Sequence, residues 1–573
     1  MNEEKYNLKI IFCIGATLLL AMTTFLPLCV SNFTLPSQGG GMVHCDPQLS
    51  ENIRRPIPTT DDVSVVWYRH DFGGELHGTF GNGIVGNGKI AACTFGPLSI
   101  LGDEEHPNDN LILYDYYGNR LWSSGWWKKP MDKQNNWSLN PYAFTSTPMV
   151  DINNWVVACD NEKIILVDAS DLNNIHVKWI TNLSQGGIPL SPTIVEDNTI
   201  ILPTTKCLYA FDVNTGDELA NRTFLCTSSD PIYGIREMNW TDFQSLMSNP
   251  LNCPYHYNST GQDIEWTSTV PYGVMPMTSV FFEGTTMFIA DRNGNVVAID
   301  TIDGSTLATD SLGTPELITD NERFYSSQNS ACVQGNRTYV LTDLSVSGWR
   351  ITNTSINMSK QNGQLYAVDV DPDAENKSDR LTIAWNYSYS GYSQASPTLI
   401  NDTLYFDGNN TLFFQNKKPH IYAVYTDGTE KWKVAYDNKT LFSFAKDPRG
   451  GFWYEDSDQI ASLWNGDTLG NKLVRFYEEN GTEMKGQTID MTKLLNDEQT
   501  VIPCSDMVIC GTETNPIMLM SANHDWGEEG KWVVAINLSD NNSLIWKVPI
   551  DSSYNYAGGL YTILTEDNHS RIL

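Results

Sequence analysis

Short apolar runs, each followed by a turn of Asp, Gly or Asn and then by a second run that often carries Trp, recur along most of the chain. We recognise eight copies of this unit, at residues 111–122, 165–174, 208–219, 296–307, 365–373, 421–432, 473–484 and 533–546. Runs of this length bounded by turn residues are typical of β-hairpins. After residue 30 no long segment has the apolar period of a helix, so the pattern predicts an all-β protein.

A second unit precedes several of these copies. It occurs at residues 145–160, 191–202, 277–290 and 396–406, and it consists of two short apolar runs around a tight turn. Two strands from each unit make one four-stranded antiparallel sheet per repeat. Equivalent positions run from Asp115 to Asn537 with a mean period of about 60 residues, which accommodates four strands and their loops.

One such sheet cannot bury both of its faces alone, and radial stacking of successive sheets solves this. The pattern therefore predicts an eight-bladed β-propeller of four-stranded antiparallel sheets over residues 64–573. Seven or nine blades are the alternatives, because residues 558–573 resemble the first strands of another repeat and residues 65–71 resemble a last strand. The two termini could share that closing sheet. Residues 222–272 lengthen one repeat and are interpreted as a surface insertion.

The clearest copies read Leu-Tyr-Ala-x-Asp, then a Thr-Gly or Asp-Gly turn, then Trp, and this unit resembles the repeat of the pyrroloquinoline-quinone-like (PQQ-like) propellers. That family includes quinoprotein alcohol dehydrogenases and the outer-membrane assembly lipoprotein BamB. The resemblance covers residues 64–573. It implies that a large flat side chain wedges between neighbouring blades. The tryptophans at this position are Trp122, Trp179, Trp385, Trp432 and Trp546.

The N-terminal region predicts export from the cytoplasm. Residues 10–30 are apolar and uncharged, and a helix of that length, at ~1.5 Å per residue, crosses a bilayer core. Lys5 and Lys9 precede this segment, so residues 1–9 are expected to be a cytoplasmic stub. We interpret residues 10–30 as a signal anchor, with a cleaved signal peptide as the alternative. Residues 31–63 contain three consecutive glycines and several prolines, and they are expected to form a flexible stalk.

The number of N-glycosylation sequons supports an extracellular or luminal location for the propeller. The chain has 18 Asn-X-Ser/Thr sites, more than chance placement would give. The alternative is that a turn composition rich in Asn, Ser and Thr produces them by accident. The candidate asparagines are Asn32, Asn136, Asn182, Asn221, Asn239, Asn258, Asn336, Asn353, Asn357, Asn376, Asn386, Asn401, Asn409, Asn438, Asn480, Asn537, Asn541 and Asn568.

An oxidising compartment would also permit disulfide bonds. Cys226 and Cys253 bracket the predicted insertion, and Cys504 and Cys510 are six residues apart, so these two pairs are the disulfide candidates. Cysteines in strand-like runs are expected to be buried apolar residues instead. They are Cys93, Cys159, Cys207 and Cys332.

The charge of the chain limits its partners. The formal net charge is −32, and such a surface repels phosphate backbones, so DNA and RNA are excluded as expected partners. The run Asp369, Asp371 and Asp373 places alternate carboxylates where they could wrap a hard cation such as Ca²⁺. It fails the EF-hand pattern at Ala374 and Arg380, and a solvated acidic hairpin loop is the alternative interpretation.

Catalytic chemistry finds little support in the sequence. The resemblance implies that an alcohol-oxidising relative would carry a disulfide between adjacent cysteines over the quinone, and this chain has no Cys-Cys pair. PQQ is therefore not expected as a cofactor, and Ca²⁺ is kept as a candidate ligand. The sequence favours a non-catalytic, membrane-tethered and glycosylated propeller whose loops bind a protein or glycan partner. The alternative is a quinoprotein-like, PQQ- and Ca²⁺-dependent oxidoreductase.

Overall fold

The computed structural model describes those parts of the chain that form the sheets and most of their short turns. The described residues are 63–66, 84–86, 89–93, 111–123, 148–150, 153–160, 162–184, 192–194, 199–204, 207–219, 224–225, 276–282, 286–291, 295–300, 303–312, 323–326, 331–346, 362–390, 396–408, 420–435, 444–456, 473–503, 507–524, 531–549, 562–564 and 570–572.

The strands form antiparallel sheets, and the six four-stranded sheets are simple meanders in chain order. In the fifth and eighth sheets the first two strands both pair with the strand that follows them, and they are counted together as the first strand. The first sheet holds β1 (Ile84–Gly86), β2 (Lys89–Cys93), β3 (Leu111–Asp115) and β4 (Arg120–Ser123). The second holds β5 (Met149–Val150), β6 (Trp155–Cys159), β7 (Lys163–Asp168) and β8 (His176–Asn182). The third holds β9 (Thr193–Ile194), β10 (Thr199–Pro203), β11 (Cys207–Asp212) and β12 (Phe224–Leu225). The fourth holds β13 (Pro276–Phe282), β14 (Thr286–Asp291), β15 (Asn295–Asp300) and β16 (Thr306–Ser311).

The second half of the chain continues this arrangement. The fifth sheet holds β17 (Arg323–Ser326), β18 (Cys332–Gln334), β19 (Arg337–Val346), β20 (Asn362–Val370) and β21 (Leu381–Ser390). The sixth holds β22 (Thr398–Ile400), β23 (Thr403–Gly408), β24 (His420–Tyr425) and β25 (Glu430–Ala435). The seventh holds β26 (Ala445–Lys446), β27 (Phe452–Asp456), β28 (Leu473–Tyr477) and β29 (Ile489–Asp490). The eighth holds β30 (Val501–Pro503), β31 (Val508–Gly511), β32 (Pro516–His524), β33 (Lys531–Asn537) and β34 (Ser543–Pro549). A two-stranded sheet of β35 (Thr562–Leu564) and β36 (Ser570–Ile572) follows.

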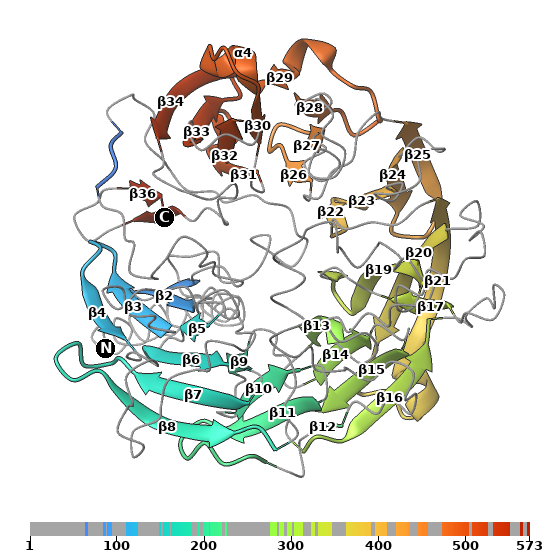
Figure 1. The fold of residues 1–573 in the computed structure, drawn as a ribbon. Helices are drawn as coiled ribbons and strands as arrows, with labels where there is room; N and C mark the ends of the chain where they lie inside the picture. The colour runs from blue at the N-terminus through green and yellow to red at the C-terminus, as the bar shows by residue number, and fades with distance from the viewer. Residues whose placement is uncertain are drawn as a thin grey trace, which may run out of the picture.

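Figure 1 shows these sheets arranged one after another around a ring, like the blades of a propeller. The two-stranded sheet β35–β36 lies between the eighth sheet and the first (Figure 1). The all-β prediction is confirmed, because the helices in the described residues are short: α4 (Met491–Leu495) and the 3₁₀ turns η5 (Lys377–Asp379) and η6 (Lys485–Gln487). Each of the eight copies predicted from sequence contains most or all of the third strand of one larger sheet, and the copies at 111–122, 296–307, 421–432 and 533–546 also reach into the fourth strand.

The hydrophobic core lies between the sheets and not within any one of them. The cluster between the sixth and seventh sheets, for example, joins Tyr405 and Ile421 to Phe452 and Tyr477. Equivalent clusters occupy each junction from the first sheet to the eighth. The outer face of the eighth sheet carries one more cluster, and Val63 packs against it. Burial on both faces explains why the middle strands read as continuous apolar runs.

Several sequence predictions fall outside the described residues. These are the apolar segment 10–30, the stalk up to residue 62 and most of the insertion 222–272. Within the insertion, Phe224–Leu225 form β12, which pairs with β11. No helix in the described part of the chain is long and apolar enough to cross a membrane.

Candidate functional site

A bulge at one fixed position shapes the outer strand of six sheets. In each of these sheets the pairing of the third strand with the fourth shifts by one residue, as at Lys431 between the pairs Ala423–Trp432 and Val424–Glu430. The same shift occurs in the first, second, fourth, fifth and eighth sheets. A bulge re-aims the side chain beside it. The bulge therefore explains why the docking tryptophan follows at a fixed place, opposite Ala367, Ala423 or Ala535 in the fifth, sixth and eighth sheets and opposite Leu113 or Leu166 in the first and second.

Three of the predicted docking tryptophans contact the next sheet in the same way. The indole Nε1 of Trp179 donates to the carbonyl oxygen of Val213 at 2.9 Å. Trp385 donates to Thr426 at 3.0 Å, and Trp432 to Glu479 at 2.9 Å. Each acceptor lies in the turn that follows the third strand of the neighbouring sheet. Trp122 packs in the cluster between the first and second sheets, and Trp546 is buried in the cluster on the outer face of the eighth sheet.

A glycine in the receiving turn makes room for each of these three indoles. A Cβ atom on Gly216 would lie 2.4 Å from Trp179, on Gly428 2.8 Å from Trp385, and on Gly481 2.6 Å from Trp432. All three glycines have positive φ, which side chains other than glycine rarely adopt. The Thr-Gly or Asp-Gly turn and the Trp of the sequence repeat are therefore two halves of one contact between neighbouring sheets.

We expect Gly481→Ala to destabilise the protein by about 1–3 kcal/mol, because it combines backbone strain with a clash against Trp432. Two other glycines separate these causes. Gly335 has φ +57 but nothing within 4 Å of an added Cβ, so Gly335→Ala should show the strain alone. Gly486 has neither feature, so Gly486→Ala should leave the urea midpoint close to that of the wild type. Equal midpoints for the Gly481 and Gly486 variants would contradict the docking geometry.

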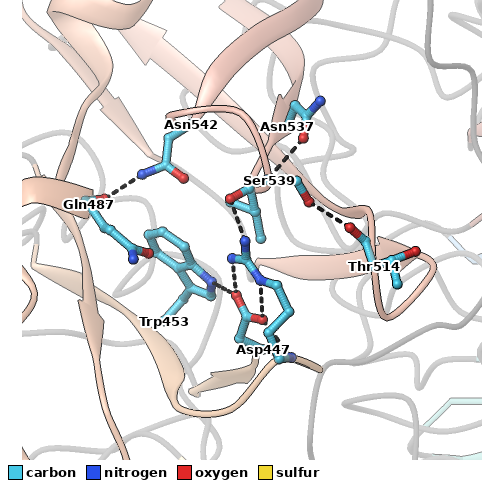
Figure 2. A network of polar contacts seen from close by, with 9 residues as sticks. Asp447, Trp453, Gln487, Thr514, Asn537, Ser539 and Asn542 are labelled. Carbon is cyan, nitrogen blue, oxygen red and sulfur yellow. Dashed lines mark hydrogen bonds and ion pairs between the residues drawn. The ribbon is translucent and has the colours of Figure 1, made fainter.

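The junction between the seventh and eighth sheets has no docking tryptophan and uses a buried ion pair instead (Figure 2). Arg449, in the β26–β27 turn, donates from Nη1 to the carbonyl oxygen of Leu538 at 2.7 Å. Leu538 directly follows β33, so this acceptor corresponds to Val213 and Thr426 at the tryptophan junctions. Arg449 Nη2 lies 2.7 Å from Asp447 Oδ2, and its Nε donates to Oδ1 at 2.9 Å.

The Asp447 carboxylate at this junction is completely buried. Besides Arg449, it accepts a hydrogen bond from the indole of the fully buried Trp453 at 2.9 Å. Asn542 adds a second bond between the two sheets, from its Nδ2 to the carbonyl oxygen of Gln487 at 2.6 Å. A buried charge needs such partners, and here they hold neighbouring sheets together. The sequence analysis missed these residues, although the Asp-Pro-Arg-Gly-Gly turn at 447–451 and the absence of Trp from the copy at 473–484 were the available signals.

Two of the three carboxylates in the acidic run predicted as a cation site are engaged elsewhere. Asp369 receives both Nε and Nη2 of Arg337, at 2.5 and 2.8 Å. Arg337 also donates to the carbonyl oxygen of Thr426 at 3.3 Å, the same atom that accepts from Trp385. Asp371 Oδ1 accepts the backbone N–H of Asp373 at 3.2 Å. This is the geometry of a hairpin turn and an inter-sheet ion pair, and these residues as placed do not fit a Ca²⁺ site.

No group of three or more His, Cys, Asp or Glu side chains in the described residues is placed to hold a metal ion. The short turns instead use their carboxylates on the backbone. Asp427 Oδ1 accepts both the backbone N–H and the hydroxyl of Thr429, and these hydrogen bonds lower the pKa of this exposed carboxyl. This turn joins β24 to β25, the third and fourth strands of the sixth sheet.

One further ion pair ties the segment after α4 to β32. Asp497 Oδ1 lies 2.9 Å from His524 Nε2, and the pKa of Asp497 is lowered by the backbone N–H of Gln499 and by His524. A depressed carboxyl pKa stabilises the fold above the unfolded value of about 3.9, and that contribution is lost as the pH falls through the folded value. We therefore expect the difference in urea midpoint between wild type and Asp497→Asn to narrow from about pH 6 to about pH 3. A constant difference would contradict the role of this charge.

The cysteine predictions had mixed outcomes. Cys159 and Cys332 are buried and form no disulfide bond, as expected. Cys510 is also buried and not disulfide-bonded, so the predicted bond between Cys504 and Cys510 is not formed. Its side chain faces the cluster with Val508 and Leu519 because these residues share one side of their strands. Cys226 and Cys253 lie outside the described residues.

Comparison with known proteins gives one family match and several structural similarities. A family model described as outer membrane protein assembly factor BamB matches residues 108–434. The search of curated proteins returned no match. Among solved structures, the chain is similar to BamB from Moraxella catarrhalis, with 12% identity, a TM-score of 0.40, and coverage of 80% of this chain and 98% of that one. It is also similar to quinohemoprotein alcohol dehydrogenase from Comamonas testosteroni, with 9% identity, a TM-score of 0.41, and coverage of 88% and 81%.

Proposed function

Because the chain belongs to the PQQ-like propeller family whose model is described as outer membrane protein assembly factor BamB, we propose that it is a non-catalytic binding scaffold. In this function the ring is a rigid support, and the connections between its strands and sheets recognise a protein or a glycan. Function on such folds resides in the loops held by a rigid framework.

The observation that carries this proposal is that two Asp–Arg pairs connect neighbouring sheets. The Asp447–Arg449 pair and the half-buried Asp369–Arg337 pair both donate across a sheet junction, to Leu538 and Thr426 respectively. A catalytic acid or base needs access to a substrate proton. The side chains of these two ion pairs instead bind each other and the backbone of the neighbouring sheet. In the proposed scaffold these two ion pairs therefore stabilise the ring and do not act on a substrate.

We infer a ring of eight complete sheets, with β35–β36 and residues 63–66 filling the gap between the eighth sheet and the first. Val63 packs on the cluster that buries Trp546, and β35–β36 lies in that gap (Figure 1). In this arrangement both ends of the propeller domain meet at one junction, and residues 31–62 lead from there to the predicted anchor at residues 10–30. The propeller itself would lie on the extracellular or luminal side and carry N-linked glycans.

Two experiments test this function. In the first, the full chain with a C-terminal tag is expressed in secretory cells, and membranes are washed with high salt and treated with protease. The tag should stay with the membranes after the wash and should be protected from protease until the vesicles are opened. Release of the chain into the cytosolic fraction would contradict the tethered, exported scaffold.

In the second, the purified chain is incubated with PQQ and Ca²⁺, and thermal unfolding and dye reduction with an alcohol substrate are measured. We expect no shift of the melting temperature and no dye reduction. A saturable shift accompanied by dye reduction would favour the oxidoreductase instead. In-cell crosslinking tests for a partner directly, and crosslinks are expected at lysines that lie between the described strands in the sequence, namely Lys128, Lys129, Lys417 and Lys418.

A further inference from the structure

We propose that one face of the ring carries N-linked glycans at the tips of its short turns, with at least one glycan on each of four successive sheets. The acceptors are Asn336, Asn376, Asn401, Asn480 and Asn541. We call this face, formed by the turns that join the first strand to the second and the third to the fourth in each sheet, the turn face. The proposal rests on the proposed export, because these glycans are attached in a secretory lumen.

All five asparagines are exposed and lie in turns. Asn336 and Asn376 belong to the fifth sheet, and Asn401, Asn480 and Asn541 to the sixth, seventh and eighth. Each is followed two positions later by Ser or Thr, as an acceptor site requires. Exposure matters because a bulky, hydrophilic glycan fits only on a side chain that reaches the surface.

Hydrogen bonds between turns place these positions on one surface. Gln334, next to the Asn336 turn, donates from Nε2 to the carbonyl oxygen of Asn401 at 3.5 Å. Asn401 donates from Nδ2 to Glu479 Oε1 at 3.2 Å, and Glu479 precedes Asn480. The turns of the fifth, sixth and seventh sheets therefore touch in sequence.

The same surface continues to the eighth sheet. Arg449, in the first turn of the seventh sheet, donates to Leu538 in the turn that holds Asn541. Ser539 of that turn donates from Oγ to the carbonyl oxygen of Thr514 at 3.1 Å, as Figure 2 shows. The proposed glycans therefore form an arc along four neighbouring sheets.

The backbone at two of the turn tips presents the side chain outward. Asn401 and Asn541 have φ values of +57 and +48, the left-handed conformation of a tight turn. Asn537 is a sequon asparagine near the same turn but differs, because it is only half exposed and its pairing with Ser543 keeps it in the β33–β34 ladder. We therefore assign the glycan of the eighth sheet to Asn541.

The arc makes the turn face asymmetric. The described turns of the first two sheets carry no sequon, and they expose Tyr117 and Leu172. Glycans would thus cover the part of the turn face formed by the fifth to eighth sheets, whereas the described turns of the first and second sheets would expose their amino-acid side chains to solvent.

The test is to express the full chain in secretory cells and release its glycans with an amidase in heavy-oxygen water, which leaves a labelled Asp at each occupied Asn. Peptide mass spectrometry should find the label at all five positions and not at Asn537. Asn541→Gln and Ser543→Ala should each lose the same single glycan, seen as one step in gel mobility. Asn174→Gln, which removes an exposed turn asparagine outside any sequon, should change nothing.

Two negative results have different meanings. Label at other sequons, such as Asn182, with none at the five turn positions would overturn the glycan arc and leave the proposed export intact. An unlabelled chain found in the cytosol would overturn both the arc and the proposed export. Label at Asn537 without label at Asn541 would overturn the assignment in the eighth sheet.

Discussion

Replacing Trp432 with alanine should lower the free energy of unfolding by about 2–4 kcal/mol. The indole fills the junction between the sixth and seventh sheets, where its ring stacks on Phe452 with a centroid distance of 6.2 Å. Its N–H also bonds to Glu479. This loss lies somewhat below the usual value of about 3–5 kcal/mol for a fully buried Trp, because Trp432 is only partly buried. Urea unfolding followed by tryptophan fluorescence measures the effect.

The matched control is Tyr117→Ala, because Tyr117 is another aromatic side chain but is 47% exposed. Surface changes of this kind usually stay within about 0.5 kcal/mol. A ring of similar junctions can loosen locally before it opens, so hydrogen exchange of β25 and β28 should accelerate before the global transition. If the Trp432 and Tyr117 variants unfold at the same urea concentration, Trp432 does not hold the two sheets together.

Replacing Arg449 with methionine should lower the free energy of unfolding by about 2–4 kcal/mol. The substitution keeps an apolar stem but leaves the fully buried Asp447 carboxylate without its cation. It also removes the bond to Leu538, which joins the seventh sheet to the eighth. Since Arg449 itself is about one-third exposed, solvent screening keeps the loss below that of a fully buried pair. The urea midpoint and the melting temperature both measure it.

The control pair is Lys493–Asp490, which has almost the same distance, 2.8 Å against 2.7 Å, but a Lys side chain that is 83% exposed. Lys493→Met should leave the urea midpoint unchanged. Adding Asp447→Asn to the Arg449 variant should recover part of the loss, because the buried charge is then gone. A double variant as unstable as the sum of the two single variants would show that the charge pair is not the cause.

The repeated part of the fold could be predicted from sequence because the repeat encodes a contact and not merely a strand. Ala423, Gly481 and Trp432 illustrate this. The alanine pairs opposite the tryptophan across the bulge, and the glycine of the next sheet receives the indole. Each of the three residues is required by the other two, so the motif identifies the junction as well as the strands.

The polar junction could not be predicted in the same way. Asp447 and Arg449 are two residues apart in a turn, and nothing in that spacing shows that the carboxylate is buried or that Leu538 lies within reach. That contact joins residues 89 positions apart. The ion pair of Asp369 left no signal for the same reason, since its partner Arg337 is 32 residues away in the sequence. Periodic contacts leave a signal in one sequence, whereas single long-range pairs do not.

The repeated bulge has a consequence for how separate molecules behave in solution. Every sheet ends in an outer strand with one unpaired edge, and such edges can template pairing with another chain and lead to aggregation. A bulge twists the strand locally and interrupts the flat row of backbone groups. In the second and sixth sheets the bulged residue is also a lysine, Lys178 or Lys431, whose charge opposes stacking of another strand. The feature that aims each tryptophan inward therefore also protects the rim of the ring, and it helps the protein to stay dispersed at high local concentration.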